Sequence, residues 1–197
     1  MASLRDLEPL YRRAPARATG VPQGGRAGAL AEWVRANTAD GEVDVLILYG
    51  YVPPAIYPLA NGQLDGSVAE LFIESLDGDA ILNQGDYMFY VSEIFKGEEG
   101  LQNLMDVPGI VMWGDDTPMT VTDAGRRIAP SLADFSSDRP FHLDELAGEW
   151  FVEAVLAQDA TGTRADPVIV RDGNRGRLIP CFQTADQDDP KGGSRRG

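Results

Sequence analysis

Short apolar segments that each stop at a polar or glycine-rich turn constrain the fold of this chain more than any other feature. The clearest is Val43 to Tyr49, which is almost continuously apolar, as expected of a strand covered on both faces of a sheet. Ala80 to Leu82 leads into Asn83-Gln84-Gly85-Asp86, and Ile110 to Trp113 leads into Gly114-Asp115-Asp116. If these strands are parallel, their turns share one edge of the sheet, where ligands bind in open α/β folds.

Helices are expected between these strands. Four segments have the apolar spacing and capping residues of helices: 27–37, 67–76, 91–105 and 122–128. Asp65 or Ser67 can cap the second, and Thr122 caps the fourth. Strands that alternate with helices predict an α/β fold, a three-layer sandwich with a mostly parallel sheet.

The C-terminal part of the chain has the pattern of a β-hairpin. Val168 to Arg171 and Arg177 to Phe182 flank the turn sequence Asp172-Gly173-Asn174-Arg175-Gly176. We expect this hairpin at one edge of the sheet.

One domain is expected. Residues 1–26 are interrupted by proline and glycine and predict an N-terminal arm, 27–189 form a single α/β domain, and 190–197 form a disordered tail.

Composition excludes several classes of function. The 197 residues carry 31 acids against 17 bases, a net charge of −14, which repels nucleic acid and anionic membrane surfaces. One cysteine and one histidine exclude a disulfide framework and a cysteine-built zinc site. No stretch approaches the roughly 20 apolar residues of a membrane helix, and the N-terminus lacks the apolar segment of a secretory signal. We therefore expect a soluble, cytoplasmic protein.

The order of elements resembles that of the class I glutamine amidotransferase-like superfamily. The strand Asp44-Val45-Leu46-Ile47-Leu48, the helix Ser67 to Leu76 and the strand start Gly78-Asp79-Ala80-Ile81-Leu82 are most similar to the trehalose-utilisation (ThuA-like) branch. The resemblance covers roughly residues 43–185 and implies a flavodoxin-like sheet.

The resemblance also places a nucleophile elbow in the turn from Asn83 to Tyr87, which contains no cysteine. Cys181 lies far along the chain, inside an apolar strand, so the cysteine–histidine–acid constellation of the amidotransferases is absent and glutamine hydrolysis is not expected. Members of the ThuA-like branch also lack that cysteine.

The carboxylates at the expected edge are the first candidates for chemistry. Asp86 and Asp115 are the candidate catalytic pair, and Asp116 is a candidate ligand-binding residue. Paired carboxylates act as acid and base, bind sugar hydroxyls or hold a hard cation. The structural alternative is that aspartate is favoured in turns because its side chain caps the backbone. We assign no metal site and no cofactor.

Four other side chains are candidates for ligand binding. Tyr51 and Tyr87 flank the turns and have flat rings suited to stacking on a sugar. His142 and Arg164 are expected to reach the same edge from the C-terminal half. A structural role for the histidine, and an internal ion pair for the arginine, are the alternatives.

Three functions remain open from the sequence. The first is a domain that binds a small molecule, with a sugar favoured; the second is a sugar-processing hydrolase or isomerase that uses the edge carboxylates. The third is a structural or assembly domain, and a homo-oligomer is left open. An exposed concave edge favours the first two, and a flat apolar patch favours the third.

Overall fold

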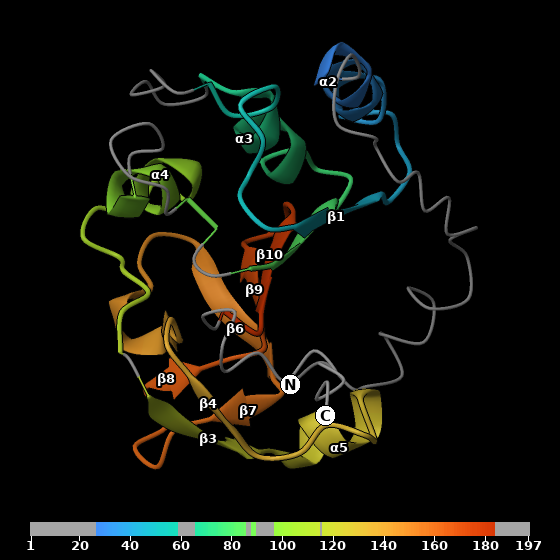
Figure 1. Cartoon of the computed structure of the whole chain (residues 1–197). Helices are drawn as coiled ribbons and strands as arrows, with labels where there is room; N and C mark the ends of the chain where they lie inside the picture. Colours follow the sequence, from blue (N-terminus) through green and yellow to red (C-terminus); the bar gives the residue numbers. More distant parts are fainter. Residues whose placement is uncertain (1–26, 59–65, 86–87, 90–96, 115, 184–197) are drawn as a thin grey trace, which may run out of the picture.

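The computed structural model describes residues 27–58, 66–85, 88–89, 97–114 and 116–183. These residues form two five-stranded sheets and the helices beside them (Figure 1). The elements in chain order are α2 (Ala27–Ala36), β1 (Val45–Tyr49), α3 (Val68–Ile73), β2 (Ala80–Gln84), α4 (Gly97–Leu104), β3 (Thr117–Val121), α5 (Asp123–Ile128), β4 (Phe135–Ser137), β5 (Phe141–His142), the 3₁₀ helix η3 (Leu143–Glu145), β6 (Trp150–Val155), β7 (Ala157–Gln158), β8 (Arg164–Ala165), β9 (Val168–Asp172) and β10 (Arg177–Cys181).

The first sheet has the order β1-β2-β10-β9-β6. Its first three strands are parallel, with Ile47, Leu82 and Ile179 side by side, whereas β9 and β6 continue it in antiparallel fashion. The second sheet has the order β4-β3-β7-β8-β5, and all its pairs are antiparallel.

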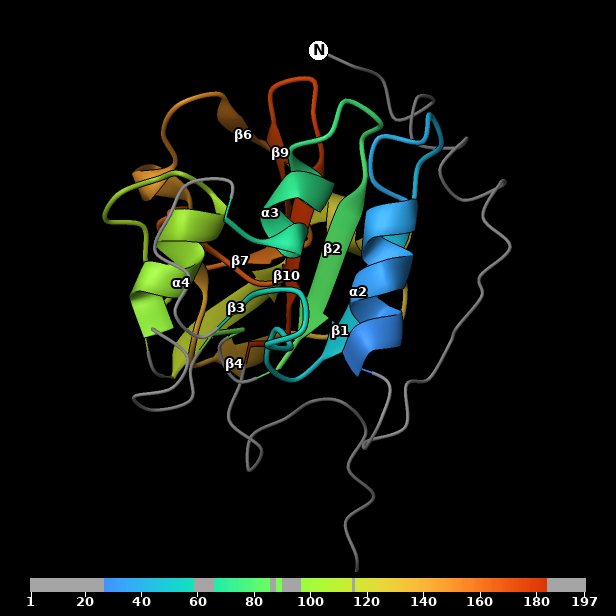
Figure 2. The ribbon, with the colours of Figure 1, turned by 90° about the horizontal axis from the view of Figure 1, so that it is seen from above.

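The prediction of a mostly parallel, flavodoxin-like, three-layer sandwich is therefore wrong. Helices α2, α3 and α4 all lie on one side of the first sheet (Figures 1 and 2), so its β1 end has two layers rather than three. The segment from Ile110 to Trp113 is not a strand. Ile110 and Met112 are fully buried, so this segment is apolar because it enters the core as irregular chain.

The predicted hairpin is confirmed as β9 and β10, but its position at the sheet edge is wrong, because β10 is the central strand. A Cβ added to Gly176 would lie 2.4 Å from the carbonyl oxygen of Ile73 and 2.6 Å from that of Asp79. The hairpin turn thus packs directly against the connection between α3 and β2, where only glycine fits.

The predicted helix starts follow ordinary capping chemistry. The Ser67 hydroxyl accepts a hydrogen bond from the Glu70 N–H, and the Glu70 carboxylate accepts one from the Ser67 N–H, which is a capping box. Thr122 caps α5 through the Gly125 N–H. Both caps confirm the sequence prediction.

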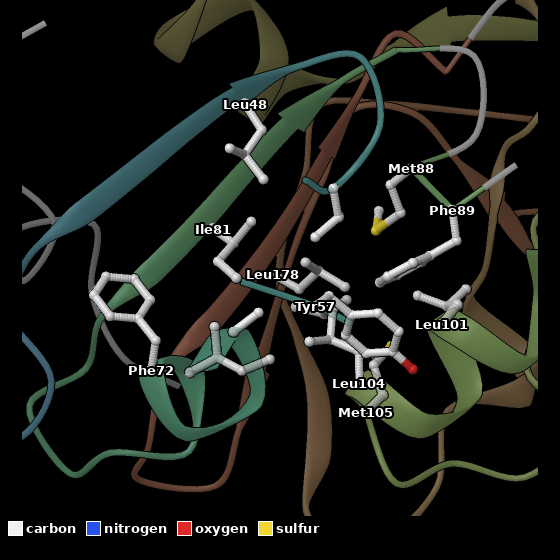
Figure 3. Close-up of a cluster of buried hydrophobic side chains, with 14 of the residues drawn as sticks. Leu48, Tyr57, Phe72, Ile81, Met88, Phe89, Leu101, Leu104, Met105 and Leu178 are labelled. Carbon is white, nitrogen blue, oxygen red and sulfur yellow. The ribbon is translucent and has the colours of Figure 1, made fainter. Parts of the chain in front are cut away.

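The main core lies between the first sheet and these helices (Figure 3). Leu48, Ile81 and Leu178 face α3 and α4 from the sheet, and Tyr57 makes an edge contact with Phe89, with ring centroids 4.8 Å apart. Tyr57 and Phe89 are both buried, so these two aromatics stabilise the core rather than line a pocket.

Candidate functional site

The turns after β1 and β2 lie together, as the sequence predicted for parallel strands. The Gly50 N–H donates a hydrogen bond to the Gln84 carbonyl at 2.6 Å, and a Cβ on Gly85 would lie 3.0 Å from the Cα of Gly50. Tyr51 follows this contact and is 40% exposed.

Three predicted site residues, Asp86, Tyr87 and Asp115, lie outside the described residues. Their roles, and the relative placement of the two carboxylates, stay predictions.

A buried polar network fills this end of the first sheet. The side-chain N–H of Asn83 donates to the Gly50 carbonyl at 2.8 Å. The side-chain N–H of Gln183 donates to the Asn83 carbonyl at 3.0 Å and to its Oδ1 at 2.9 Å. Asn83 and Gln183 are both fully buried. Asn83, near the end of β2, therefore binds Gln183, just after β10, rather than projecting its side chain into solvent.

Asp166 connects this network to the second sheet. Its carboxylate accepts hydrogen bonds from the Ser137 hydroxyl at 2.7 Å, from the Gln183 N–H at 2.8 Å and from the Phe182 N–H at 2.5 Å. Asp166 is fully buried. Three donors on one carboxylate compensate for its removal from water, which indicates a structural role.

Trp113 lies at the same end of the first sheet, where Arg139 holds it. The Arg139 guanidinium lies 4.8 Å from the centroid of the Trp113 ring, and the Arg139 N–H donates to the Gln183 carbonyl at 2.9 Å. The loop between β4 and β5 thus holds Trp113 near the end of β10, although the segment that leads to Trp113 is not a strand. Asp116, which follows, is exposed, and its N–H donates to Asp138 Oδ1 at 3.2 Å.

His142 and Arg164 are brought together, because they are paired residues of β5 and β8. His142 is 6% exposed; its Nδ1 lies 2.9 Å from Glu145 Oε1 and its Nε2 2.6 Å from the Trp113 carbonyl oxygen. Arg164 forms an ion pair with Asp144 at 2.5 Å. Both ring nitrogens and the guanidinium are thus engaged within the protein, which supports the structural alternatives for both residues.

The described part of the chain shows no group of three or more His, Cys, Asp or Glu placed to hold a metal ion. One shallow hollow lies over the second sheet, between β3, α5 and β7, and Thr120, Thr122, Asp123, Arg126, Gln158 and Asp159 line it. It contains none of the predicted site residues.

A different surface stands out, on the side of β1 that faces away from the helices. Leu46 and Leu48 are each 6% exposed, whereas Val45, Ile47 and Tyr49 are 45%, 51% and 79% exposed. Val43, just before the strand, is 44% exposed on the same side. We call Val43, Val45, Ile47 and Tyr49 the β1 face. Leu82 and Ile179, both partly buried, extend it across β2 and β10.

The outer edge of β1 coincides with this face. β1 ends the strand order of the first sheet, as far as the described residues show. The Asp44 carbonyl accepts a hydrogen bond from the Ala80 N–H of β2, and the Gly50 N–H donates one to the Gln84 carbonyl. The even-numbered residues of β1 therefore direct their backbone N–H and C=O groups toward β2. Because the backbone groups of successive strand residues point to opposite sides, those of Val45, Ile47 and Tyr49 point away from β2, toward the open edge of the sheet. The strand contains no lysine, proline or bulge, the usual protections of an exposed edge.

Acidic residues gather at the start of β1. Asp40 and Glu42 are exposed, and Asp77 accepts a hydrogen bond from the Gly41 N–H at 3.1 Å. Burial, and then the negative charges of Asp40, Glu42 and Asp77, raise the pKa of Asp44 above its ordinary value. The β1 face is thus apolar along its length and negatively charged at one end.

Comparisons with protein-family models, with curated proteins and with solved structures found no match for this chain. The resemblance to the ThuA-like branch stays a prediction. Nothing in the described fold supports amidotransferase chemistry or a role in carbohydrate metabolism, and the flavodoxin-like sheet that the resemblance implied is not present. No helix among the described residues is both long enough and apolar enough to cross a membrane.

The sequence interpretation missed the β1 face. A continuous apolar run predicts a strand buried on both sides, and Val43 to Tyr49 is such a run. Exposure of its odd-numbered residues depends on where the strand lies in the sheet and on which side the helices pack, and neither can be read from the run itself.

Proposed function

We propose that this chain is a protein-interaction domain and that the β1 face is its binding surface. The observation that supports this proposal most directly is that Val45, Ile47 and Tyr49 combine exposed apolar side chains with outward-pointing backbone groups. Large apolar surfaces of this kind mark interaction sites, and an unprotected edge strand is a template for a further strand.

The charge of the surface specifies the chemistry of the partner. We propose an extended segment with apolar residues at alternate positions and lysine or arginine at the end that meets Asp40, Glu42 and Asp44. Alternate apolar residues would cover the β1 face while the backbone pairs with the strand edge. The basic end would relieve the repulsion among the carboxylates, which adds to the effect of burial in raising the pKa of Asp44.

Two synthetic ten-residue peptides test this proposal, one that alternates valine with lysine and one that alternates valine with glutamate. Binding to the full chain is measured by fluorescence anisotropy. We expect the lysine peptide to bind at least tenfold more tightly than the glutamate peptide, with the difference reduced at high salt.

The matched variants are Ile47→Asp and Phe151→Asp. Phe151 lies on β6, at the opposite edge of the first sheet, and is 45% exposed, close to the 51% of Ile47. Because both positions are exposed, we expect both replacements to preserve the fold. Ile47→Asp should weaken binding of the lysine peptide at least tenfold, which corresponds to about 1.4 kcal/mol, and Phe151→Asp should leave it unchanged. Equal affinities for the two variants would contradict the proposal.

The binding pocket for a sugar, and the sugar-processing enzyme, stay predictions that rest on Asp86 and Asp115, which the described residues do not include. The exposed apolar side chains of the β1 face favour the assembly alternative over both.

A further inference from the structure

The strand β1 itself is an extended segment with apolar residues at alternate positions, so a second copy of the chain can supply an added strand. Val45, Ile47 and Tyr49 have exposed side chains, and their backbone groups point to the open edge. An antiparallel register with Ile47 opposite Ile47, and Val45 opposite Tyr49, pairs all three residues with those of the second copy. This register is symmetric about a two-fold axis, the commonest symmetry of homodimers.

The antiparallel register also keeps the acidic residues of the two copies apart. Asp40, Glu42 and Asp44 precede β1, so the two acidic clusters would lie beyond opposite ends of the paired strands. A five-residue strand is about 17 Å long, which exceeds the Debye length of about 8 Å at physiological ionic strength. A parallel pair would instead bring the two clusters together. The acidic end of each β1 face stays uncovered in the antiparallel pair, so a partner with a basic end makes a contact that the second copy does not.

Helix α2 provides a second surface at this edge. It lies on the helix-covered side of the sheet at the β1 end and runs in the opposite direction to β1 (Figures 1 and 2). Ala31 and Val34 are buried, and the Trp33 ring lies 6.2 Å from that of Phe72 on α3, between centroids. Because α3 covers one flank of α2, the opposite flank lies toward the open edge. The exposed residues of α2 are Gly28, Ala29, Glu32, Arg35 and Ala36.

The exposed side of α2 is complementary in charge to its own two-fold copy. A two-fold axis at Ile47 would set the two α2 helices side by side and antiparallel. A ten-residue helix is about 15 Å long, close to the length of β1, so the middle of α2 is about level with the axis. Glu32 is near this middle, and Arg35 follows about 4.5 Å further along the helix. Each Glu32 would then lie within reach of the second copy's Arg35. Neither residue forms an ion pair within the described part of the chain.

We propose, on the basis of the proposed function, that two copies of this chain pair through β1 in the antiparallel register, with Glu32–Arg35 ion pairs between the α2 helices, and that a partner must displace the second copy. The two first sheets would form one continuous sheet. The net charge of −14 on each copy opposes association, so the dimer dissociates on dilution. The apparent affinity of a partner for the β1 face then falls as the concentration of the chain rises.

Sedimentation velocity of the full chain, between about 1 and 200 µM, tests the dimer. We expect monomer at the lower end and dimer at the upper end. The Glu32→Arg and Arg35→Glu variants should each weaken the dimer at least tenfold, because each turns two attractions into two repulsions. The double variant Glu32→Arg/Arg35→Glu should regain the native dimer, and so should a mixture of the two single variants. Arg126→Glu, at an exposed arginine on α5, is the matched charge reversal and should leave the dimer unchanged.

The lysine peptide separates this inference from the proposed function, because Arg35→Glu leaves the β1 face intact. The peptide should convert the native dimer to monomer, and the monomeric Arg35→Glu variant should bind it at least as tightly as the native chain. A native chain that stays monomeric throughout, or a dimer that Arg35→Glu does not weaken, would overturn the inference, and peptide binding would leave the interaction surface standing. A dimer with the expected charge-reversal behaviour, without peptide binding, would support the inference and overturn the proposed partner chemistry.

Discussion

Asp79 Oδ2 accepts a hydrogen bond from the Ser75 hydroxyl at 2.9 Å, while its Oδ1 accepts one from the Asp44 N–H, also at 2.9 Å. This fully buried carboxylate joins the end of α3 to the start of β1. Burial, with smaller contributions from the charges of Asp77 and Asp44, raises its pKa to about 6, because these hydrogen bonds offset only part of the desolvation.

The Asp79→Asn variant should remove a pH dependence of stability. In the folded protein Asp79 holds its proton up to about pH 6, whereas in the unfolded chain its pKa is the ordinary 3.8 of an aspartate. Between these values the folded state binds more protons, so the free energy of unfolding falls as pH rises through this window and is level above it. The raised pKa of Asp79 thus changes the free energy of unfolding by at most about 3 kcal/mol across this window. Asparagine keeps an acceptor for the Asp44 N–H and carries no charge, so the variant should gain stability relative to the native protein between pH 4 and pH 7.

Urea denaturation at several pH values between 3.5 and 8 measures this difference. Asp123→Asn, at an exposed carboxylate on α5, is the control and should follow the native curve. Parallel native and Asp79→Asn curves across the window would contradict the assignment.

The sequence predicted local elements better than their arrangement. Ser67, Thr122 and the hairpin turn act through contacts a few residues away, so their caps and strands can be recognised from spacing alone. Ile110 and Met112 are apolar because they enter the core, and irregular buried chain has the same composition as a short strand. The parallel direction of β1 and β2 was predicted correctly, but the central place of β10 depends on contacts about a hundred residues apart, such as that of Gln183 with Asn83.

The candidate site shows the same division. The meeting of the turns at Gly50 and Gly85 followed from parallel strands. His142 and Arg164 were expected to face a ligand, but Glu145 and Asp144, in the short helix after β5, engage them instead. Glu145 lies three residues after His142, so spacing could have suggested that contact. Asp144 lies 20 residues before Arg164, so neither this ion pair nor the pairing of His142 with Arg164 across strands could be read from the sequence.

Asp166→Ala should be strongly destabilising. The replacement leaves the buried Gln183 N–H and Ser137 hydroxyl, and the partly buried Phe182 N–H, without their acceptor. We expect the free energy of unfolding to fall by about 2–4 kcal/mol. Ser137→Ala, which removes a single donor, should cost about 1 kcal/mol. Urea denaturation at pH 7 measures both, and similar small losses for the two variants would show that the carboxylate does not hold the end of β10.

Two glycine replacements should have effects of opposite sign. A Cβ at Gly176 meets the Ile73 and Asp79 carbonyl oxygens, so Gly176→Ala requires a shift of the backbone and should cost about 3 kcal/mol or more. Gly28 lies in the first turn of α2 and has nothing within 4 Å of the added atom, so Gly28→Ala should raise stability by about 0.5 kcal/mol. Thermal unfolding of the two variants beside the native protein gives the comparison. A tolerated Gly176→Ala would mean that the hairpin turn is not seated against α3 and β2.

Cys181 should be almost unreactive in the folded protein. Burial, and secondarily the charge of Asp166, raises the pKa of its thiol from 9.0 to about 12. Because the thiolate is the nucleophile, a shift of this size lowers the reactive fraction at pH 8 about a thousandfold. We expect the reaction with a disulfide reagent such as DTNB to be slower in the native protein than in denaturing urea by at least that factor. As Cys181 is the only cysteine in the chain, the signal is unambiguous.

A native rate within tenfold of the denatured rate would show that the end of β10 opens readily. The Asp166→Ala variant should produce such a fast reaction, because it releases the adjacent Phe182 and Gln183 N–H groups.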